Sequence, residues 1–301
     1  METRSRRRQA SSLAHVPHDM LLLVGEACSN PLAPKALAYL ASTSCQILNV
    51  LRPKLNELRE FRAELRALCS KERFGAHASS LDEAVRLNWS GRGLGHGLTP
   101  ADVTVLGRLL RSGALALLKR LTLGTNKLSD AGMIAFAEAL NAPIMALRSL
   151  QMLSLNANRI GDEGMKAFSI AISSGALGQL TFLHLGQNRV GDSGMQAFAS
   201  AVANGALGSL RELQLDANQI GNAGMTAFAE ALKSPMRALE SLLKLSFDRN
   251  RIGDEGMQAF STAINCGALP ALRSVVAGSN PGNNLDLEEA CKTRGIGFFA
   301  W

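Results

Sequence analysis

Residues 183–198 read LHLGQNRVGDSGMQAF, and four other segments of the chain repeat this phrase with few changes. These copies begin at residues 121, 153, 213 and 245, so each copy follows the previous one after 30 or 32 residues. A tandem unit of this length is typical of a solenoid, in which each repeat buries its apolar side by stacking on its neighbours. We therefore expect a stacked array over this part of the chain.

Each copy opens with a short alternating stretch. In residues 180–185, Leu183 and Leu185 are two positions apart, as are Phe182 and His184. This period predicts a strand with the leucines in the core and the other pair on the open side. An Asn follows each apolar pair by three residues. Its amide both donates and accepts hydrogen bonds, so we expect a ladder that satisfies the turn backbone: Asn126, Asn158, Asn188, Asn218, Asn250 and Asn280.

A helix is predicted after each turn. The residues before the apolar runs are of types preferred as helix N-caps. They are Asp130, Asp162, Asp192, Asn222 and Asp254. The next residues, such as Met165 and Phe168 with Ala171 and Ile172, recur with helical spacing. A stripe of this kind is typical of a buried helix face. We therefore assign the repeated Met and Phe to the core, not to a binding surface.

This combined pattern resembles the leucine-rich repeat of the ribonuclease-inhibitor type. The resemblance covers residues 81–283, about six repeats. It implies an α/β solenoid shaped as a horseshoe, with parallel strands on the concave face and helices on the convex face. Helices are wider than the spacing of strands, so stacking the two bends the array. Residues 284–301, with Phe298, Phe299 and Trp301, are expected to cap the last repeat.

The residues before the array contain no repeat. Residues 1–14 form a basic tail that we expect to be disordered, and residues 15–75 form a small all-α region. Residues 16–24 (VPHDMLLLV) and 36–48 (ALAYLASTSCQIL) resemble a degenerate F-box. That family docks the linker protein of a cullin ubiquitin ligase, here through residues 15–52. A non-functional relic of that motif, or a plain helical cap of the solenoid, is the alternative.

Composition limits the classes of function. Residues 1–80 hold 12 Lys and Arg against 7 Asp and Glu, so they carry most of the formal charge of +7. The repeats are nearly neutral and poor in Tyr and Trp, which argues against nucleic acid as a partner. Five scattered Cys suit a reducing compartment, and no apolar stretch is long enough for a membrane span. We expect a cytoplasmic or nuclear protein that has no metal, no cofactor and no catalytic residues.

The positions between the core residues differ from copy to copy, as a binding face requires. Trp89, Met152, Phe182 and His184 are apolar or amphipathic side chains without a predicted core role, and they are the candidate hot spots. Acidic residues flank them. The candidate protein-binding residues are Trp89, Arg120, Met152, Phe182, His184, Glu212, Asp216, Lys244 and Asp248.

These observations predict a non-catalytic scaffold that binds a protein on the concave face of the array. One alternative is a substrate adaptor of a cullin-RING ubiquitin ligase, which rests on the F-box-like segment. Another is a structural component of the cytoskeleton or axoneme.

Overall fold

A computed structural model of the chain describes residues 85–90, 98, 100–111, 115–141, 147–234 and 238–300, together with the single positions 60 and 63. The predicted basic tail and nearly all of the predicted helical region, including the F-box-like segment, lie outside the described residues. Trp301 also lies outside them.

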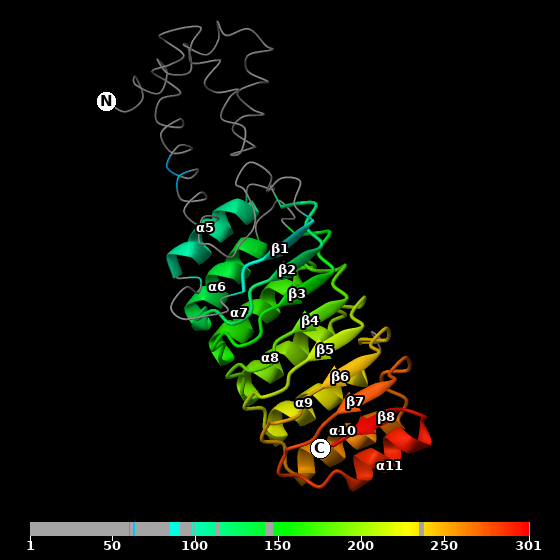
Figure 1. Cartoon of the computed structure of the whole chain (residues 1–301). Coiled ribbons are helices and arrows are strands. Elements are labelled where there is room, and N and C mark those ends of the chain that lie inside the picture. The colour runs from blue at the N-terminus through cyan, green and yellow to red at the C-terminus, as the bar shows by residue number, and fades with distance from the viewer. Residues whose placement is uncertain are drawn as a thin grey trace, which may run out of the picture.

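Eight short strands form one open sheet, in which every neighbouring pair is parallel and the spatial order follows the chain order. Figure 1 shows them stacked along one side of the array. The strands are β1 (Arg86–Asn88), β2 (Arg120–Thr122), β3 (Met152–Ser154), β4 (Phe182–His184), β5 (Glu212–Gln214), β6 (Lys244–Ser246), β7 (Ser274–Val276) and β8 (Gly297–Phe299).

Seven helices among the described residues alternate with these strands, so each repeat contributes one strand and one helix. They are α5 (Pro100–Arg111), α6 (Ser129–Leu140), α7 (Asp162–Ser173), α8 (Asp192–Ala203), α9 (Asn222–Leu232), α10 (Asp254–Asn265) and α11 (Leu285–Thr293). The predicted α/β solenoid is confirmed, with strands on the concave side and helices on the convex side (Figure 1). None of the described helices is long and apolar enough to cross a membrane.

The core lies between the sheet and the helices. The central residue of each strand from β1 to β7 is buried, as Leu153 and Leu183 illustrate, and the residue after most strands, such as Leu155 or Leu185, is buried too. The helices close the core with the repeated Met and Phe; Met165, Phe168 and their equivalents are fully buried. Burial of side chains of this size supplies the main stabilising free energy of the array.

The repeated Asn side chains join neighbouring turns. Asn188 Nδ2 donates to the carbonyl of Leu185 in its own repeat and to that of Leu155 in the preceding repeat. Its Oδ1 accepts from the backbone N–H groups of Asn158 and Ile160, both in the preceding repeat. Asn218, Asn250 and Asn280 make equivalent contacts. Each Asn thus reaches back along the chain by one repeat.

The Asp residues at the helix starts act differently from what the sequence predicts. Asp162 begins α7 but makes no side-chain cap there, because Gly161 is the N-cap residue. Its Oδ1 instead accepts from the backbone N–H groups of Gly191 and Gly194, at the start of α8 in the next repeat. Asp130, Asp192 and Asn222 make the same forward contact. The prediction that these residues cap their own helices is therefore wrong.

Close approach explains why each helix start also carries Gly. A Cβ on Gly194 would lie 2.7 Å from Asp162 Oδ1 and 3.1 Å from Asp162 Cα. Only a residue without a side chain lets the preceding repeat come this near. The carboxylate lies at the positive end of the helix dipole, where negative charge is stabilised.

The C-terminal end contains one strand more than the sequence predicts. Residues 284–301 were expected to cap the last repeat, and within them β8 pairs in parallel with β7, with Phe298 beside Val275. Phe298 is partly buried and packs against the core, as expected of a cap. Phe299 is 37% exposed, so it covers less of the core of the last repeat than the sequence predicts.

Candidate protein-binding face

Register pairing along the sheet places the variable outward positions side by side. The first residues of β2 to β6 form one row across the concave face: Arg120, Met152, Phe182, Glu212 and Lys244. The third residues form a second row with His184 and Gln214 at its centre. Asp216 and Asp248 follow β5 and β6 two residues beyond their ends, as Gly186 follows β4. Eight of the nine predicted binding residues therefore lie on this one surface.

An apolar patch lies in the middle of the face. Phe182 is 37% exposed and is the only large hydrophobic residue of β2 to β6 with this much of its surface in water. Met152 is its register partner on β3 and is half-buried. An exposed aromatic group beside a flexible thioether is chemically suited to contact apolar side chains of another protein.

His184 lies beside this patch and next to a carboxylate. Its Nε2 atom is 3.6 Å from Glu212 Oε1, which is too long for a hydrogen bond. Gln214 donates to that same carboxylate oxygen at 2.8 Å. Burial lowers the pKa of His184, and the charges of Glu212 and Asp216 oppose this shift. The imidazole is therefore neutral at neutral pH, and its buried Nε2 has no hydrogen-bond partner among the described residues.

Asp216 is held close to the backbone of the neighbouring repeat. A Cβ on Gly186 would lie 2.5 Å from Asp216 Oδ1, so the Gly makes room for the carboxylate. Burial and the nearby Asp248 raise the pKa of Asp216, against the lowering effects of a backbone hydrogen bond, Arg249 and His184. The ionised carboxylate is thus less stable here than in water.

Asp248 is oriented from two sides. Ser246 Oγ donates to its Oδ1 at 2.7 Å, and Arg249 Nε is 3.9 Å from its Oδ2. Only 19% of the Asp248 side chain is exposed, against 69% of Arg249. The carboxylate therefore has a fixed position on the face, while the guanidinium extends into solvent.

Trp89 does not belong to this surface and is a correction to the predicted set. It is fully buried, and its backbone N–H donates to the carbonyl of Thr122. Register pairing of β1 with β2 places Trp89 at the position of Leu123, which is a core position. The first repeat is irregular, and no Asn follows its strand at the ladder position, so its sequence does not mark which residues face the core.

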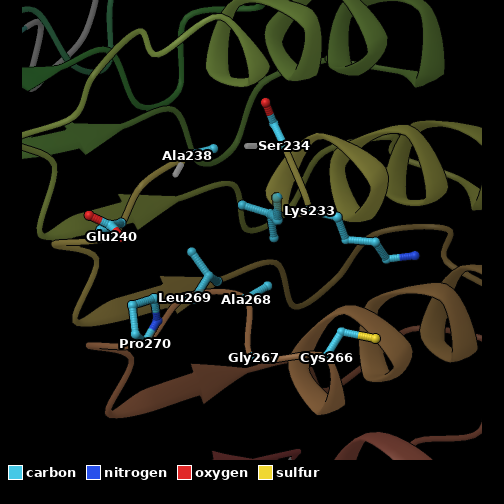
Figure 2. A pocket seen from close by; sticks show the side chains of 10 residues that line it. Lys233, Ser234, Ala238, Glu240, Cys266, Gly267, Ala268, Leu269 and Pro270 are labelled. Atoms are coloured by element: carbon cyan, nitrogen blue, oxygen red, sulfur yellow. The ribbon is translucent and has the colours of Figure 1, made fainter. Parts of the chain in front are cut away.

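We also searched the described residues for metal sites and pockets. No group of three or more His, Cys, Asp and Glu side chains among them is arranged to hold a metal ion. A hollow of about 370 Å³ lies between the C-terminal ends of α9 and α10. Figure 2 shows Lys233 and Glu240 on opposite sides of it, so its polar groups do not converge on one point.

Five segments of the chain match a protein-family model described as Leucine Rich repeat, at residues 114–137, 146–169, 180–199, 209–229 and 238–261. Each segment spans one strand, from β2 to β6, and at least the first turns of the helix that follows. These five segments, which hold β2 to β6, are therefore similar to leucine-rich repeats. No curated protein matches it significantly. The ribonuclease-inhibitor subtype stays a prediction.

Proposed function

We propose that this chain is a non-catalytic interaction scaffold that binds a protein partner on its concave face. Leucine-rich repeats are typically non-catalytic and serve protein interaction. The observation that carries the proposal is the exposed Phe182 at the centre of the sheet face, beside Met152 and within a surface whose residues differ from repeat to repeat. Core positions stay the same across those repeats, so the variation is confined to the side that meets solvent.

The arrangement fits the anatomy of a protein interface. Binding energy is usually concentrated in a few central aromatic or long side chains, with polar residues around them. Here Phe182 and Met152 supply the centre, and Arg120, Glu212 and Lys244 extend the same row on both sides. The rigid parallel sheet keeps these positions fixed, which reduces the entropy lost on binding.

The test compares the partners that wild-type and variant chains recover in cells by proximity labelling. A Met152→Ala/Phe182→Ala double variant should lose a set of proteins that the wild type labels. The matched control is Ile170→Ala, since Ile170 is 67% exposed but lies on α7, on the convex side. An unchanged set of labelled proteins in the double variant, or an equal loss in the control, contradicts the proposal.

The adaptor hypothesis is a second candidate, supported by the F-box-like sequence at residues 16–48. These residues lie outside the described ones, so it rests on the sequence alone. The full chain should then bind the purified cullin-ligase linker protein, and a Leu21→Asp/Leu22→Asp variant should not. Absence of binding by the wild-type chain removes the adaptor hypothesis and leaves the concave-face proposal intact.

A further inference from the structure

Charged side chains are distributed unequally along the concave face. On the described residues of β1 to β4 the outward row begins with two cations in register, Arg86 and Arg120, and contains no carboxylate. Carboxylates on this face occur only further along, at Glu212 on β5 and at Asp216 and Asp248 just beyond the ends of β5 and β6. Phe182 and Met152 separate the two regions. The face therefore runs from basic through apolar to acidic in chain order.

The two charged regions differ in how firmly their groups are held. Glu212 and Asp248 keep 21% and 19% of their side chains exposed, and each accepts a side-chain hydrogen bond. Lys244 also lies in this region, next to Glu212 in register, but it is exposed and forms no ion pair with any described residue. Long exposed cationic side chains can change conformation at little cost in free energy. Arg249, which is 69% exposed beside Asp248, is a second long cation here, so the three carboxylates and two cations leave a formal charge of −1 on this region.

At the basic end, Arg86 and Arg120 are exposed, and neither has an ion-pair partner among the described residues. Adjacent strands are about 4.8 Å apart, so two cations here repel each other across a short distance. At the acidic end, Asp216 and Asp248 follow neighbouring paired strands at equivalent positions, and the charge of Asp248 raises the pKa of Asp216. A ligand that places a negative group at the first end and a positive group at the second relieves both repulsions.

We propose that the partner of this face is a protein segment that carries acidic side chains over β1 and β2, an apolar side chain over Phe182, and a Lys or Arg over Asp216 and Asp248. Five strand spacings separate β1 from β6, about 24 Å. An extended segment covers this distance with about seven residues, and a helix with about sixteen. The inference rests on the proposed function and adds the composition and order of the partner's residues.

The test is selection of a displayed random peptide library on the immobilised full chain, with peptides of about twenty residues so that an extended or a helical segment can cover β1 to β6. Peptides enriched by the wild type should have Asp or Glu on one side of an apolar residue and Lys or Arg on the other. An Asp216→Asn/Asp248→Asn variant keeps the shape of both side chains and should abolish the preference for Lys and Arg only. An Arg86→Gln/Arg120→Gln variant should abolish the preference for Asp and Glu only. A selected peptide should bind each variant about tenfold more weakly than it binds the wild type.

The outcomes separate the two proposals. Peptides that require Met152 and Phe182 but show no charge order overturn the inference and leave the concave-face function standing. Peptides whose binding is unaffected by Met152→Ala/Phe182→Ala overturn both. A selection that enriches no peptide above the uncoated support also counts against both. Thermal unfolding of each variant by circular dichroism verifies that its fold is retained.

Discussion

Asn188 links two repeats through the same amide, so its loss leaves several buried backbone groups without partners. Its side chain bonds the carbonyls of Leu155 and Leu185 and the N–H groups of Asn158 and Ile160. Each unsatisfied buried group costs on the order of 1–3 kcal/mol. We expect Asn188→Ala to lower the free energy of unfolding by about 3 kcal/mol, measured by urea denaturation.

Asn156→Ala is the matched control for that measurement. Asn156 is half-buried, and its Oδ1 has no hydrogen-bond partner among the described residues. Its replacement should change the free energy of unfolding by less than about 0.5 kcal/mol. Equal destabilisation by the two substitutions would show that the ladder contacts do not stabilise the array.

His184 makes the stability of the array depend on pH. Its pKa is lowered by burial, so protonation is less favourable in the folded chain than in the unfolded chain. The stability associated with the neutral ring is fully present above the unfolded pKa, near 6.5, and is lost as the pH falls toward the lowered folded value. The loss of unfolding free energy between pH 7.5 and 5.5 should be smaller in His184→Gln than in the wild type. If the unfolding free energy of the two chains falls by the same amount over this pH range, this prediction is contradicted.

Residue type and spacing identify the face but not every member of it. Phe182 and His184 were predicted correctly to point outward, because they occupy a regular repeat in which the buried leucines fix the register. Trp89 was assigned wrongly because the first repeat lacks a recognisable Asn. No other residue of that repeat indicates which positions face the core. A strand register error of one residue exchanges the inner and outer faces. The half-burial of Asp216 against Gly186 depends on contact between repeats, which spacing alone does not reveal.

Successive helices are joined by the forward contacts of the Asp row. Asp162 accepts two backbone N–H groups at the start of α8, and Asn222 does the same for α10. Since an Asn serves at one junction, Asp162→Asn should be nearly neutral. Asp162→Ala should cost about 1–2 kcal/mol of unfolding free energy, as expected for the loss of a helix cap.

Asn222→Asp is the complementary change. It adds a negative charge at the N-terminus of α10 and should stabilise the fold by about 0.5 kcal/mol, an effect that high salt reduces. These differences are measured by chemical denaturation at low and high ionic strength. Equal effects of Asp162→Asn and Asp162→Ala would mean that the accepting oxygen contributes nothing.

The sequence predicted that Asp and Asn start the helices but not which helix each one caps. Capping preference is a property of residue type and is normally satisfied within one helix. In this array the helices lie side by side with their N-termini aligned, so the next helix is within reach of the same carboxylate. Gly at both positions that donate the backbone N–H groups is the sequence feature that accompanies this arrangement, and it becomes interpretable only once the stacking distance is known.

The strong helix contacts of the described array join each helix to the next along the chain, so stability is a sum of local terms. Phe298→Ala at the C-terminal end should therefore increase amide hydrogen exchange in α10 and α11 and leave α6 and α7 unchanged. Phe299→Ala is the control, because Phe299 is more exposed than the partly buried Phe298. Faster exchange throughout the array would indicate that it unfolds as one unit.

The repeated phrase predicted the whole solenoid because every copy forms the same strand, turn and helix. Strand β8 was not predicted as a strand, since residues 297–299 read GFF and lie outside the repeated phrase. Phe298 nevertheless takes the position that Val275 holds in β7. The need to cover the last core residues, not a repeated motif, determines this end of the molecule.

The opposite directions of the two rows of polar contacts have a consequence for how the chain is made. The N–H of Ile160 donates to Asn188, which lies later in the chain. The N–H of Gly191, before α8, donates to Asp162, which lies earlier in the chain. A ribosome that releases the chain N-terminus first supplies each new helix with an acceptor already in position, while the newest turn stays incomplete until the next repeat emerges. Growth of the array is thus directional, and each finished repeat is a template for its successor.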